Sequence, residues 1–315
     1  MFLTRPADVA PLQVAGLSKV YGSGVGVHDV SFVVPPGSVT AFIGVNGAGK
    51  STTLKCVMGL AAKDAGDIRL YGEAASFARR RAIGFLPEER GLAPRDRARD
   101  AIAFSGRLQG MGRRDAYRRA DALLERIGLG ARGRARVSEL SKGNAQRVQI
   151  LSAIAHDPAL LILDEPFSGL DPLAQAEVQS LFVEHRARGG AILFSTHAMS
   201  VAERLCDRVV VVSKGRTVFE GDMAAAAEHA PHGVYVTVQD DAALLQTVAR
   251  LGGRAEAFAG KIGQSMRWRV LLPKTVPYVA LMRALAEREL SVDGFEPIQA
   301  DLEGAFFSLA RDEAA

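Results

Sequence analysis

Short apolar segments bounded by turn residues recur along the first two thirds of the chain. Each has the length of a strand rather than of a buried helix. The glycine-rich loop Gly22-Ser-Gly-Val-Gly26 separates the first two segments, and Pro35-Pro36-Gly37 ends the second. The expected strands are residues 12–20, 27–34, 39–43, 160–163, 191–195 and 208–212.

Helical periodicity fills the intervals between several of these strands. Between about residues 98 and 127 the apolar positions recur at helical spacing, with arginine-rich polar faces. The expected helices are residues 52–60, 98–127, 145–155 and 172–188. Strand–helix–strand spacing predicts a parallel sheet with helices on its faces, which is an α/β architecture.

After Gly221 a second pattern begins. Strands are expected at 234–238, 254–258, 267–272 and 292–297, with helices at 242–251 and 276–289. This βαββαβ order predicts a small α+β unit in which both helices cover one face of the sheet. Residues 301–311 are expected to form a closing helix. The two halves show no internal repeat, and the second half has no phosphate loop.

Composition narrows the class of protein. The 315 residues are 48% hydrophobic and 23% charged, which is typical of a folded chain. At about 150 residues per domain, this length predicts two domains. The net charge of +4 is too small to indicate a nucleic-acid partner. The apolar runs are far shorter than the roughly 18 residues that a membrane span requires.

Two further features predict a cytosolic setting. The first residues, Met1 to Asp8, have no apolar segment behind a basic start, so no secretory signal is expected. Cys56 and Cys206 are far apart and lie in apolar helical segments. We therefore expect buried reduced thiols rather than a disulfide.

The segment Gly44-Val-Asn-Gly-Ala-Gly-Lys-Ser51 matches the phosphate-loop pattern at every position, after a strand and before a helix. Glycines allow backbone N–H groups to surround a phosphate, and the helix N-terminus favours an anion. Lys50 is expected to reach the β- and γ-phosphates, and the Ser51 hydroxyl to bind Mg²⁺. The expected nucleotide-binding residues here are Gly44, Val45, Asn46, Gly47, Ala48, Gly49, Lys50, Ser51 and Thr52.

Two carboxylates follow the apolar strand at 160–163. The end of a parallel strand holds polar side chains at the sheet edge where ligands bind. Asp164 is expected to hold Mg²⁺, and Glu165 to act as the base that orients or deprotonates the attacking water. An Asp-Glu pair alone is equally consistent with a helix cap. The phosphate loop in the same chain favours the catalytic interpretation.

A third motif, Leu140-Ser-Lys-Gly-Asn144, opens the helix at 145–155. Ser141 and the N–H groups at Gly143 make another anion site at a helix N-terminus. Here the chain resembles the ATP-binding subunits of ABC transporters, whose signature reads Leu-Ser-Gly-Gly-Gln. The resemblance implies that Ser141, Gly143 and Asn144 contact the γ-phosphate held by a second subunit. Ser141 lies 23 residues before Asp164, which leaves room for one helix and one strand.

Other segments resemble the same family in chain order. Ser168-Gly-Leu-Asp171 resembles the D-loop, which implies that Asp171 lies at the dimer interface. His197 resembles the switch histidine that senses the γ-phosphate. Tyr21 resembles the aromatic residue that stacks on adenine. The resemblance covers roughly residues 10 to 220.

The departures from the family pattern affect one candidate metal ligand. Val45 replaces a proline, while Lys142 and Asn144 replace residues of the signature. Glu88 occupies the position of the usual Q-loop glutamine. A carboxylate can bind Mg²⁺ but adds like charge near a triphosphate, so metal contact and a relay to a membrane partner both stay open for Glu88. The string Leu86-Pro-Glu-Glu-Arg-Gly-Leu92 resembles ABC-2-type export ATPases that include sodium-extrusion-like systems.

The resemblance implies an α/β P-loop ATPase core with a helical arm at about 89–156 and an antiparallel β subdomain, together spanning residues 10–221. A small C-terminal α+β accessory domain is expected at 222–315, with a role in regulation, dimer support or stability. Clusters of arginine between residues 79 and 136 are expected to be solvated helix faces, or else contacts to anionic lipid or a permease.

The expected function is that of the ATP-binding and hydrolysing subunit of an ABC exporter, with ATP and Mg²⁺ as cofactors. Lys50, Glu165 and His197 are the expected catalytic residues. The implied partners are a second copy of the chain, or a paralogous ATPase, in a head-to-tail dimer and a separate integral membrane permease. The chain would then lie at the cytoplasmic face of the cell membrane.

Two alternatives belong to other functional classes. One is a soluble ABC-type ATPase that acts on ribosomes or nucleic acid, disfavoured by the single phosphate loop and the lack of sustained heptads. The other is a nucleotide-binding module without hydrolysis, for which Glu88 is the suspicious residue. Lys50, Asp164, Glu165 and His197 argue against it. The transported substrate cannot be inferred from the sequence.

Overall fold

The computed structural model describes residues 9–22, 24–89, 91–262 and 265–312. The expectation about a secretory signal lies outside the described residues. The chain folds into two compact units, Met1–Met223 and Ala224–Ala315. Cys56 and Cys206 are both buried and free, as predicted, and burial raises the pKa of each thiol. Within the described residues, no helix combines the length and apolarity needed to cross a membrane.

A six-stranded sheet forms the centre of the first unit. Its strands are β3 (Val39–Ile43), β6 (Gly84–Leu86), β7 (Leu160–Asp164), β8 (Ala191–Thr196), β9 (Arg208–Ser213) and β10 (Arg216–Asp222), in the order β10-β9-β3-β8-β7-β6. All neighbours are parallel except β10, which pairs antiparallel with β9. Strands β3, β7 and β8 are buried at every position, as expected for a sheet covered on both faces. The predicted parallel sheet is confirmed.

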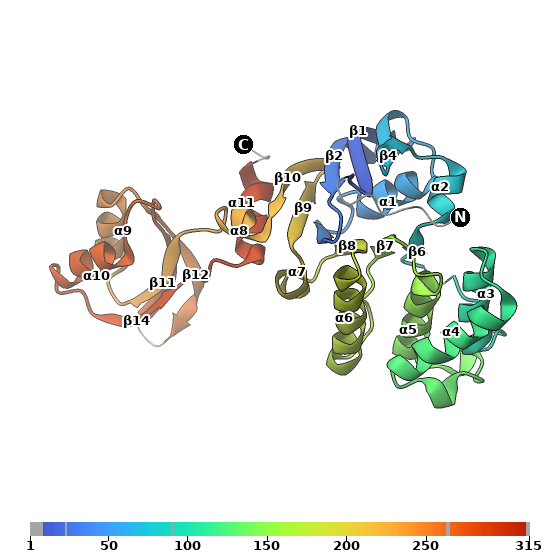
Figure 1. Ribbon diagram of the computed structural model, residues 1–315. Helices are drawn as coiled ribbons and strands as arrows, with labels where there is room; N and C mark the ends of the chain where they lie inside the picture. Colours follow the sequence, from blue (N-terminus) through green and yellow to red (C-terminus); the bar gives the residue numbers. More distant parts are fainter. Residues whose placement is uncertain (1–8, 23, 90, 263–264, 313–315) are drawn as a thin grey trace. The chain divides into compact units, whose positions relative to one another are not determined.

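A second, antiparallel sheet joins β1 (Leu12–Val20), β2 (Gly26–Val34), β4 (Ala65–Leu70) and β5 (Glu73–Ala74) in the order β2-β1-β4-β5. Helix α1 (Lys50–Met58) contacts β1 and β2 on one side and β7 on the other (Figure 1). Leu54 and Val57 of α1 join the buried core that both sheets share. This packing holds the first turn of α1 at the edge of the parallel sheet.

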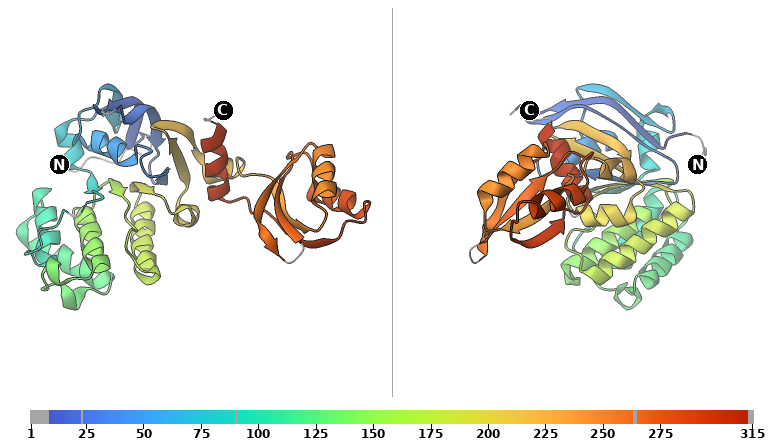
Figure 2. Two further views of the ribbon diagram at one scale, coloured as in Figure 1. Left: turned by 180° about the vertical axis from the view of Figure 1, so that it is seen from behind. Right: turned by 90° about the vertical axis from the view of Figure 1, so that its left-hand side faces the viewer.

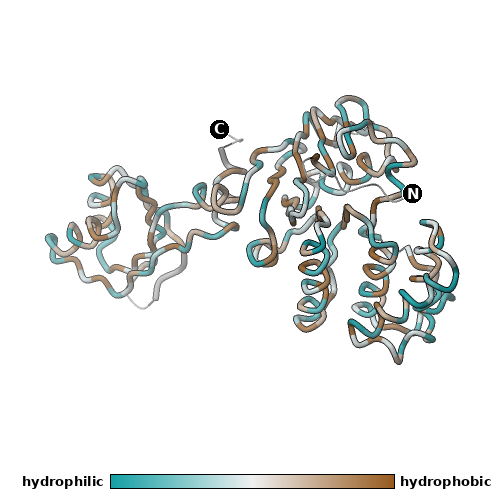
Figure 3. The backbone as a smooth tube through the Cα atoms, viewed as in Figure 1, coloured by the Kyte–Doolittle hydropathy of each residue, from teal (hydrophilic) through white to brown (hydrophobic). Residues whose placement is uncertain are grey.

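The helical arm contains α3 (Ala98–Leu108), α4 (Arg113–Arg126) and α5 (Lys142–Ile154). Figures 1 and 2 show these helices grouped together, and α3 contacts both α4 and α5. Figure 3 shows hydrophilic colour along α4, whose buried face is narrow. The unit is completed by helices α2 (Phe77–Arg81), α6 (Pro172–Ala187) and α7 (Met199–Leu205) and by the short 3-10 turns Gly130–Arg132 and Val137–Glu139.

The second unit has the predicted βαββαβ order. After α8 (Met223–Ala227) its elements are β11 (Gly233–Val238), α9 (Asp241–Arg250), β12 (Arg254–Ile262), β13 (Ser265–Leu271), α10 (Tyr278–Ala286), β14 (Val292–Pro297) and α11 (Leu302–Asp312). The antiparallel sheet has the order β12-β13-β11-β14. Val234, Val236 and Val238 of β11 share one core with Leu244 of α9 and Leu281 of α10. Since alternate residues of a strand share a face, both helices cover the same face of the sheet.

Candidate functional site

The phosphate loop connects β3 to α1, and its conformation requires glycine. Gly47 and Gly49 have φ angles of 83° and 101°, in the left-handed region. A Cβ atom on Gly44 would lie 2.5 Å from the carbonyl oxygen of Val212. Because α1 begins at Lys50, its unpaired N–H groups face the loop. The loop therefore has the geometry of an anion cradle.

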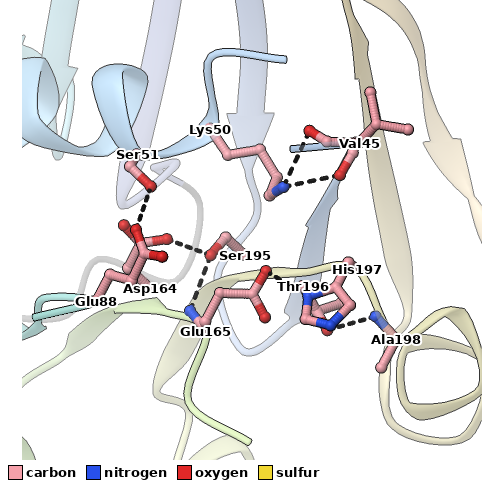
Figure 4. Close-up of polar contacts among 11 residues, drawn as sticks. Val45, Lys50, Ser51, Glu88, Asp164, Glu165, Ser195, Thr196, His197 and Ala198 are labelled. Carbon is pink, nitrogen blue, oxygen red and sulfur yellow. Dashed lines mark hydrogen bonds and ion pairs between the residues drawn. The ribbon is translucent and has the colours of Figure 1, made fainter. Parts of the chain in front are cut away.

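The Lys50 side chain folds over this loop and is only 7% exposed. Its Nζ donates to the carbonyl oxygen of Gly44 at 2.7 Å and lies 3.4 Å from that of Val45 (Figure 4). A buried ammonium group needs such partners. The contacts hold the positive charge directly above the loop.

The Asp164 and Glu165 carboxylates occupy the carboxyl end of β7. Asp164 is 3% exposed, and Glu165 has a left-handed backbone with φ of 49°. Ser195, fully buried on β8, donates a hydrogen bond to Oδ1 of Asp164. The same Oγ accepts from the backbone N–H of Glu165 at 2.9 Å. One hydroxyl therefore fixes the side chain of one acid and the backbone of the next.

Ser195 is a site residue that the sequence interpretation missed. It closes the strand expected at 191–195, and it is the direct parallel partner of Asp164 in the sheet. Aligning the carboxyl ends of the two expected strands would have placed this hydroxyl beside the carboxylate.

His197 follows β8 and lies against Glu165. Its Nδ1 is 3.0 Å from Oε1 of Glu165, while the His197 side chain is 65% exposed. Thr196 supports the turn, because its Oγ1 accepts from the backbone N–H of Ala198 at 3.0 Å. The structure thus brings the candidate base and the candidate switch histidine into contact.

Oxygen ligands for a hard cation gather near the first turn of α1. The Ser51 hydroxyl donates to Oε2 of Glu88 at 3.2 Å, and Asp164 lies close by (Figure 4). Among the described residues, no group of three or more histidine, cysteine or acidic side chains forms a metal cluster. Mg²⁺ is commonly held by one or two carboxylates together with phosphate oxygens and water. Ser51, Asp164 and Glu88 fit that donor set.

A cavity of about 260 Å³ lies over the phosphate loop. Its wall contains Asn46, Gly47, Gly49, Lys50, Ser51, Thr52, Glu88 and Glu165, together with Val25 and Gly26. The last two were not predicted as site residues; Val25 directly precedes β2, and Gly26 is its first residue. The cavity gathers most of the loop and two of the three expected acids, Glu88 and Glu165, whereas Asp164 is not part of its lining.

Tyr21 does not line this cavity. It is 44% exposed, and the Lys19 ammonium lies 5.6 Å from its ring centroid. Asp64 ties down the chain before it by accepting from the Val20 N–H at 2.7 Å and from Lys19 at 2.9 Å. These bonds lower the pKa of Asp64 and raise that of Lys19. The position of Tyr21 is therefore fixed from its N-terminal side.

Two further predicted residues are helix caps. Ser141 caps α5 by accepting from the Asn144 N–H at 3.2 Å, and Asp171 caps α6 by accepting from the Ala174 N–H at 2.9 Å. A Cβ on Gly143 would lie 3.2 Å from the Gly169 carbonyl oxygen, so the two segments approach closely. Ser141, Gly143, Asn144 and Asp171 lie outside the lining of the cavity in the same chain.

Comparison with known protein sequences identifies related chains. The family model described as ABC transporter matches residues 27–168. The ABC transporter ATP-binding protein YhaQ of Bacillus subtilis is 37% identical over 212 residues, covering 67% of this chain and 71% of that protein. The Nod factor export ATP-binding protein I of Paraburkholderia xenovorans is 39% identical over 253 residues, covering 78% of this chain and 83% of that protein.

Solved structures show the same similarity. The ATP-binding subunit of an ABC transporter superposes with a TM-score of 0.65 at 35% identity, covering 69% of this chain and 92% of that structure. The protein cbiO1 of Clostridium perfringens, part of the ABC transporter complex cbiONQ, superposes with a TM-score of 0.60 at 27% identity. That alignment covers 68% of this chain and 89% of the other.

Proposed function

Because this chain belongs to the ATP-binding subunits of ABC transporters, we propose that it binds and hydrolyses MgATP to drive a separate membrane permease. The observation that supports this best is the cavity above the phosphate loop, which brings Lys50 and Glu165 to one site. The Oε1 atom of Glu165 in turn lies 3.0 Å from Nδ1 of His197. An anion cradle, a buried cation and an oriented carboxylate together suit phosphoryl transfer to water.

In this proposal each residue has a separate task. The loop amides and Lys50 bind the triphosphate, and Tyr21 stacks on adenine. Ser51, Asp164 and Glu88 would hold Mg²⁺, which when bound neutralises charge between the β- and γ-phosphates. Glu165 accepts a hydrogen bond from the attacking water and takes its proton, while His197 fixes the carboxylate. Ser195 keeps both acids in register.

The second nucleotide contact comes from another copy of the chain. Ser141, Gly143 and Asn144 form a helix N-terminus, yet they do not line the cavity of their own chain. A helix N-terminus favours an anion. We place this terminus and Asp171 against the γ-phosphate bound by a partner copy in a head-to-tail dimer.

A groove beside the cavity supplies a contact for the permease. It has a volume of about 370 Å³ and lies among α2, β6 and the helical arm. Phe77 and Leu108 in its lining are 78% and 55% exposed. Phe85 and Pro87 also line it, and the next residue, Glu88, contacts Ser51. A permease seated here would sense the nucleotide site through Glu88, at the cytoplasmic face of the membrane.

We infer that transport is export. The relatives named Nod factor export ATP-binding protein I, together with the Leu86 to Leu92 string, support membership of the ABC-2-type export group. The substrate belongs to the permease and is not specified by these residues.

The dimer is tested by light scattering on a Glu165→Gln chain, which should bind MgATP without turning it over. We expect twice the monomer mass with MgATP and the monomer mass with MgADP. Adding Ser141→Arg should restore the monomer, whereas the exposed control Ser138→Arg should leave the dimer intact. A Glu165→Gln chain that binds MgATP and stays monomeric would contradict the shared site.

The partner is tested by purifying the full chain from detergent-solubilised cells. Recovery of a polytopic membrane protein supports the permease. Recovery of ribosomes or nucleic acid in its place would favour the alternative class of soluble ABC-type ATPase.

A further inference from the structure

The C-terminal unit contains a cavity of its own, of about 500 Å³. It lies between the adjoining ends of β12 and β13, the segment before β11, and α11. Cationic side chains dominate its polar lining: Arg254, Arg269 and Lys274, with His232 beside them. No carboxylate belongs to the lining among the described residues.

Arg269 is the cation of this group that has a buried polar atom without a partner. Its Nε is buried and has no hydrogen-bond partner. Three other described arginines have a buried Nε of this kind, but each of them forms an ion pair, with Asp121, Glu177 or Glu220. Among the described residues Arg269 has no such pair. A half-buried guanidinium without a carboxylate is costly unless an anion completes it.

The neighbouring charges leave this cavity basic. Arg267, two residues earlier on β13, is neutralised by Glu296, with its Nη2 atom 2.6 Å from Oε2 of that carboxylate. Its Cζ atom also lies 4.8 Å from the centroid of the Tyr235 ring. Glu256 is the cross-strand partner of Arg269, but it neither lines the cavity nor forms an ion pair within the described chain. Lys274 donates to the Glu228 carbonyl oxygen and forms no ion pair with any residue in the described part of the chain.

The same cavity also has an apolar wall. Phe307 of α11 lines it while remaining 52% exposed, and Leu271 lies beside Arg269 on the strand. The Ser308 hydroxyl adds a polar group. A volume of this order accommodates a small organic molecule rather than a bare ion.

We propose that this cavity binds an organic phosphate monoester. The phosphate lies between the Arg254 and Arg269 guanidinium groups, whose planar forks each match two phosphate oxygens. The organic part packs against Phe307 and Leu271. Several cations without a carboxylate favour a dianionic phosphate over a singly charged carboxylate. This site is separate from the phosphate loop and does not rest on ATP hydrolysis.

Phenyl phosphate is the probe, titrated calorimetrically into the full chain with saturating MgADP present to fill the phosphate loop. Wild type should bind it, and Arg269→Gln should bind about tenfold more weakly because charge-assisted hydrogen bonds are lost. Arg254→Gln should also weaken binding. Arg250→Gln, an exposed change of the same charge on α9, should bind as wild type does.

Folding is checked by fluorescence of Trp268, the sole tryptophan, which lies on β13 and donates to Asp241. If Arg269→Gln changes this fluorescence, Arg254→Gln is compared with wild type instead, because Arg254 is exposed. Absence of phenyl phosphate binding to wild type, or equal binding by all four chains, would overturn the proposal for a soluble phosphate.

Vesicles distinguish the source of the phosphate. Sedimentation with phosphatidate vesicles but not phosphatidylcholine vesicles, lost in Arg254→Gln, would assign the site to a lipid headgroup. Binding of phenyl phosphate alone would assign it to a soluble metabolite. Binding to neither probe would eliminate the site.

Discussion

Asp164 and Glu165 are neighbours in sequence but occupy different surroundings at the end of β7. Asp164 is nearly inaccessible and does not line the cavity, while Glu165 turns through a left-handed backbone into the cavity wall. A left-handed conformation in a residue other than glycine is uncommon and costs free energy. The hydrogen bond from the Glu165 N–H to Ser195 helps hold this conformation. The separation of roles therefore depends on a hydroxyl from another strand.

Replacing Ser195 with alanine removes this support. We expect kcat for ATP hydrolysis to fall roughly tenfold, about 1.4 kcal/mol in the barrier, because Glu165 loses its orientation. The Kd for ATP should change little, since the loop and Lys50 are untouched. The kcat and the Kd for ATP are both measured on the complex of this chain with its permease. The matched control is Ser213→Ala, a buried serine at the end of β9. A Ser195→Ala chain that matches this control in kcat would refute the positioning role.

Glu88 supplies the second prediction at this scale. If its carboxylate joins Ser51 in holding Mg²⁺, Glu88→Gln should raise the Mg²⁺ concentration for half-maximal hydrolysis several-fold. Glu89→Gln changes the same charge one residue away and should leave it unaltered. A Glu88→Gln complex with an unchanged Mg²⁺ requirement but weaker coupling to the permease would show that Glu88 relays movement instead.

At the scale of single residues, the sequence predicted those contacts that are coded locally. The phosphate loop and the two acids after β7 follow from contiguous residues whose surroundings are a strand end and a helix start. Ser195 could not be found in this way, because its role depends on the pairing of β8 with β7. Val25 and Gly26 line the cavity because the antiparallel sheet places them there. No contiguous sequence motif marks that arrangement either.

At the scale of elements, the sequence predicted the buried strands of the first unit well and missed several of its exposed ones. The fully buried β3, β7 and β8 are continuous apolar runs. Strands β4 and β10 were not predicted, because most of their residues are partly or fully exposed and carry little apolar signal. The three-residue strand β6 is too short to show a period. β10 and β6 are the two edges of the six-stranded sheet, while β4 lies between β1 and β5, and all three form because a neighbouring strand offers hydrogen bonds.

The end of α5 carries a prediction about pH. His156 follows this helix and is 9% exposed, and burial lowers its pKa below the ordinary 6.5. As pH falls, His156 is protonated in the unfolded chain before it is protonated in the folded chain. The stability contributed by the neutral buried histidine is therefore complete above pH 6.5 and is lost as pH falls toward the folded-state pKa. We expect the free energy of unfolding to drop by up to about 1.4 kcal/mol per pH unit there.

His156→Phe should remove this part of the pH dependence, measured by urea unfolding between about pH 7 and pH 5. His229→Gln, at an exposed position, should keep the wild-type dependence. Identical slopes for wild type and His156→Phe would contradict a buried neutral histidine.

At the scale of the whole molecule, two units carry different kinds of site. The first unit has a cavity with acids for chemistry, and the second has a cavity with cations and no acid in its lining. The sequence pattern predicted the βαββαβ order of the second unit from its periodicity, but it gave no sign of the basic cavity. That cavity combines residues from β12, β13 and α11, which only the folded chain brings together. The division into domains at 10–221 and 222–315 stays a proposal.

Composition alone suggested independence from the membrane, whereas the proposed function makes the chain a partner of a membrane permease. A phosphate loop, a signature helix that does not serve its own cavity, and an apolar groove linked to Glu88 all suit a subunit that works against partners.

The most direct measurement is ATP hydrolysis by this chain reconstituted with its permease, comparing wild type with Glu165→Gln. We expect wild type to release phosphate in a Mg²⁺-dependent manner, and Glu165→Gln to bind ATP equally well with turnover reduced at least a hundredfold, because general-base catalysis typically supplies about that factor. A Glu165→Gln complex that hydrolyses ATP at the wild-type rate, or a wild-type complex that binds ATP without hydrolysing it, would contradict the proposed function.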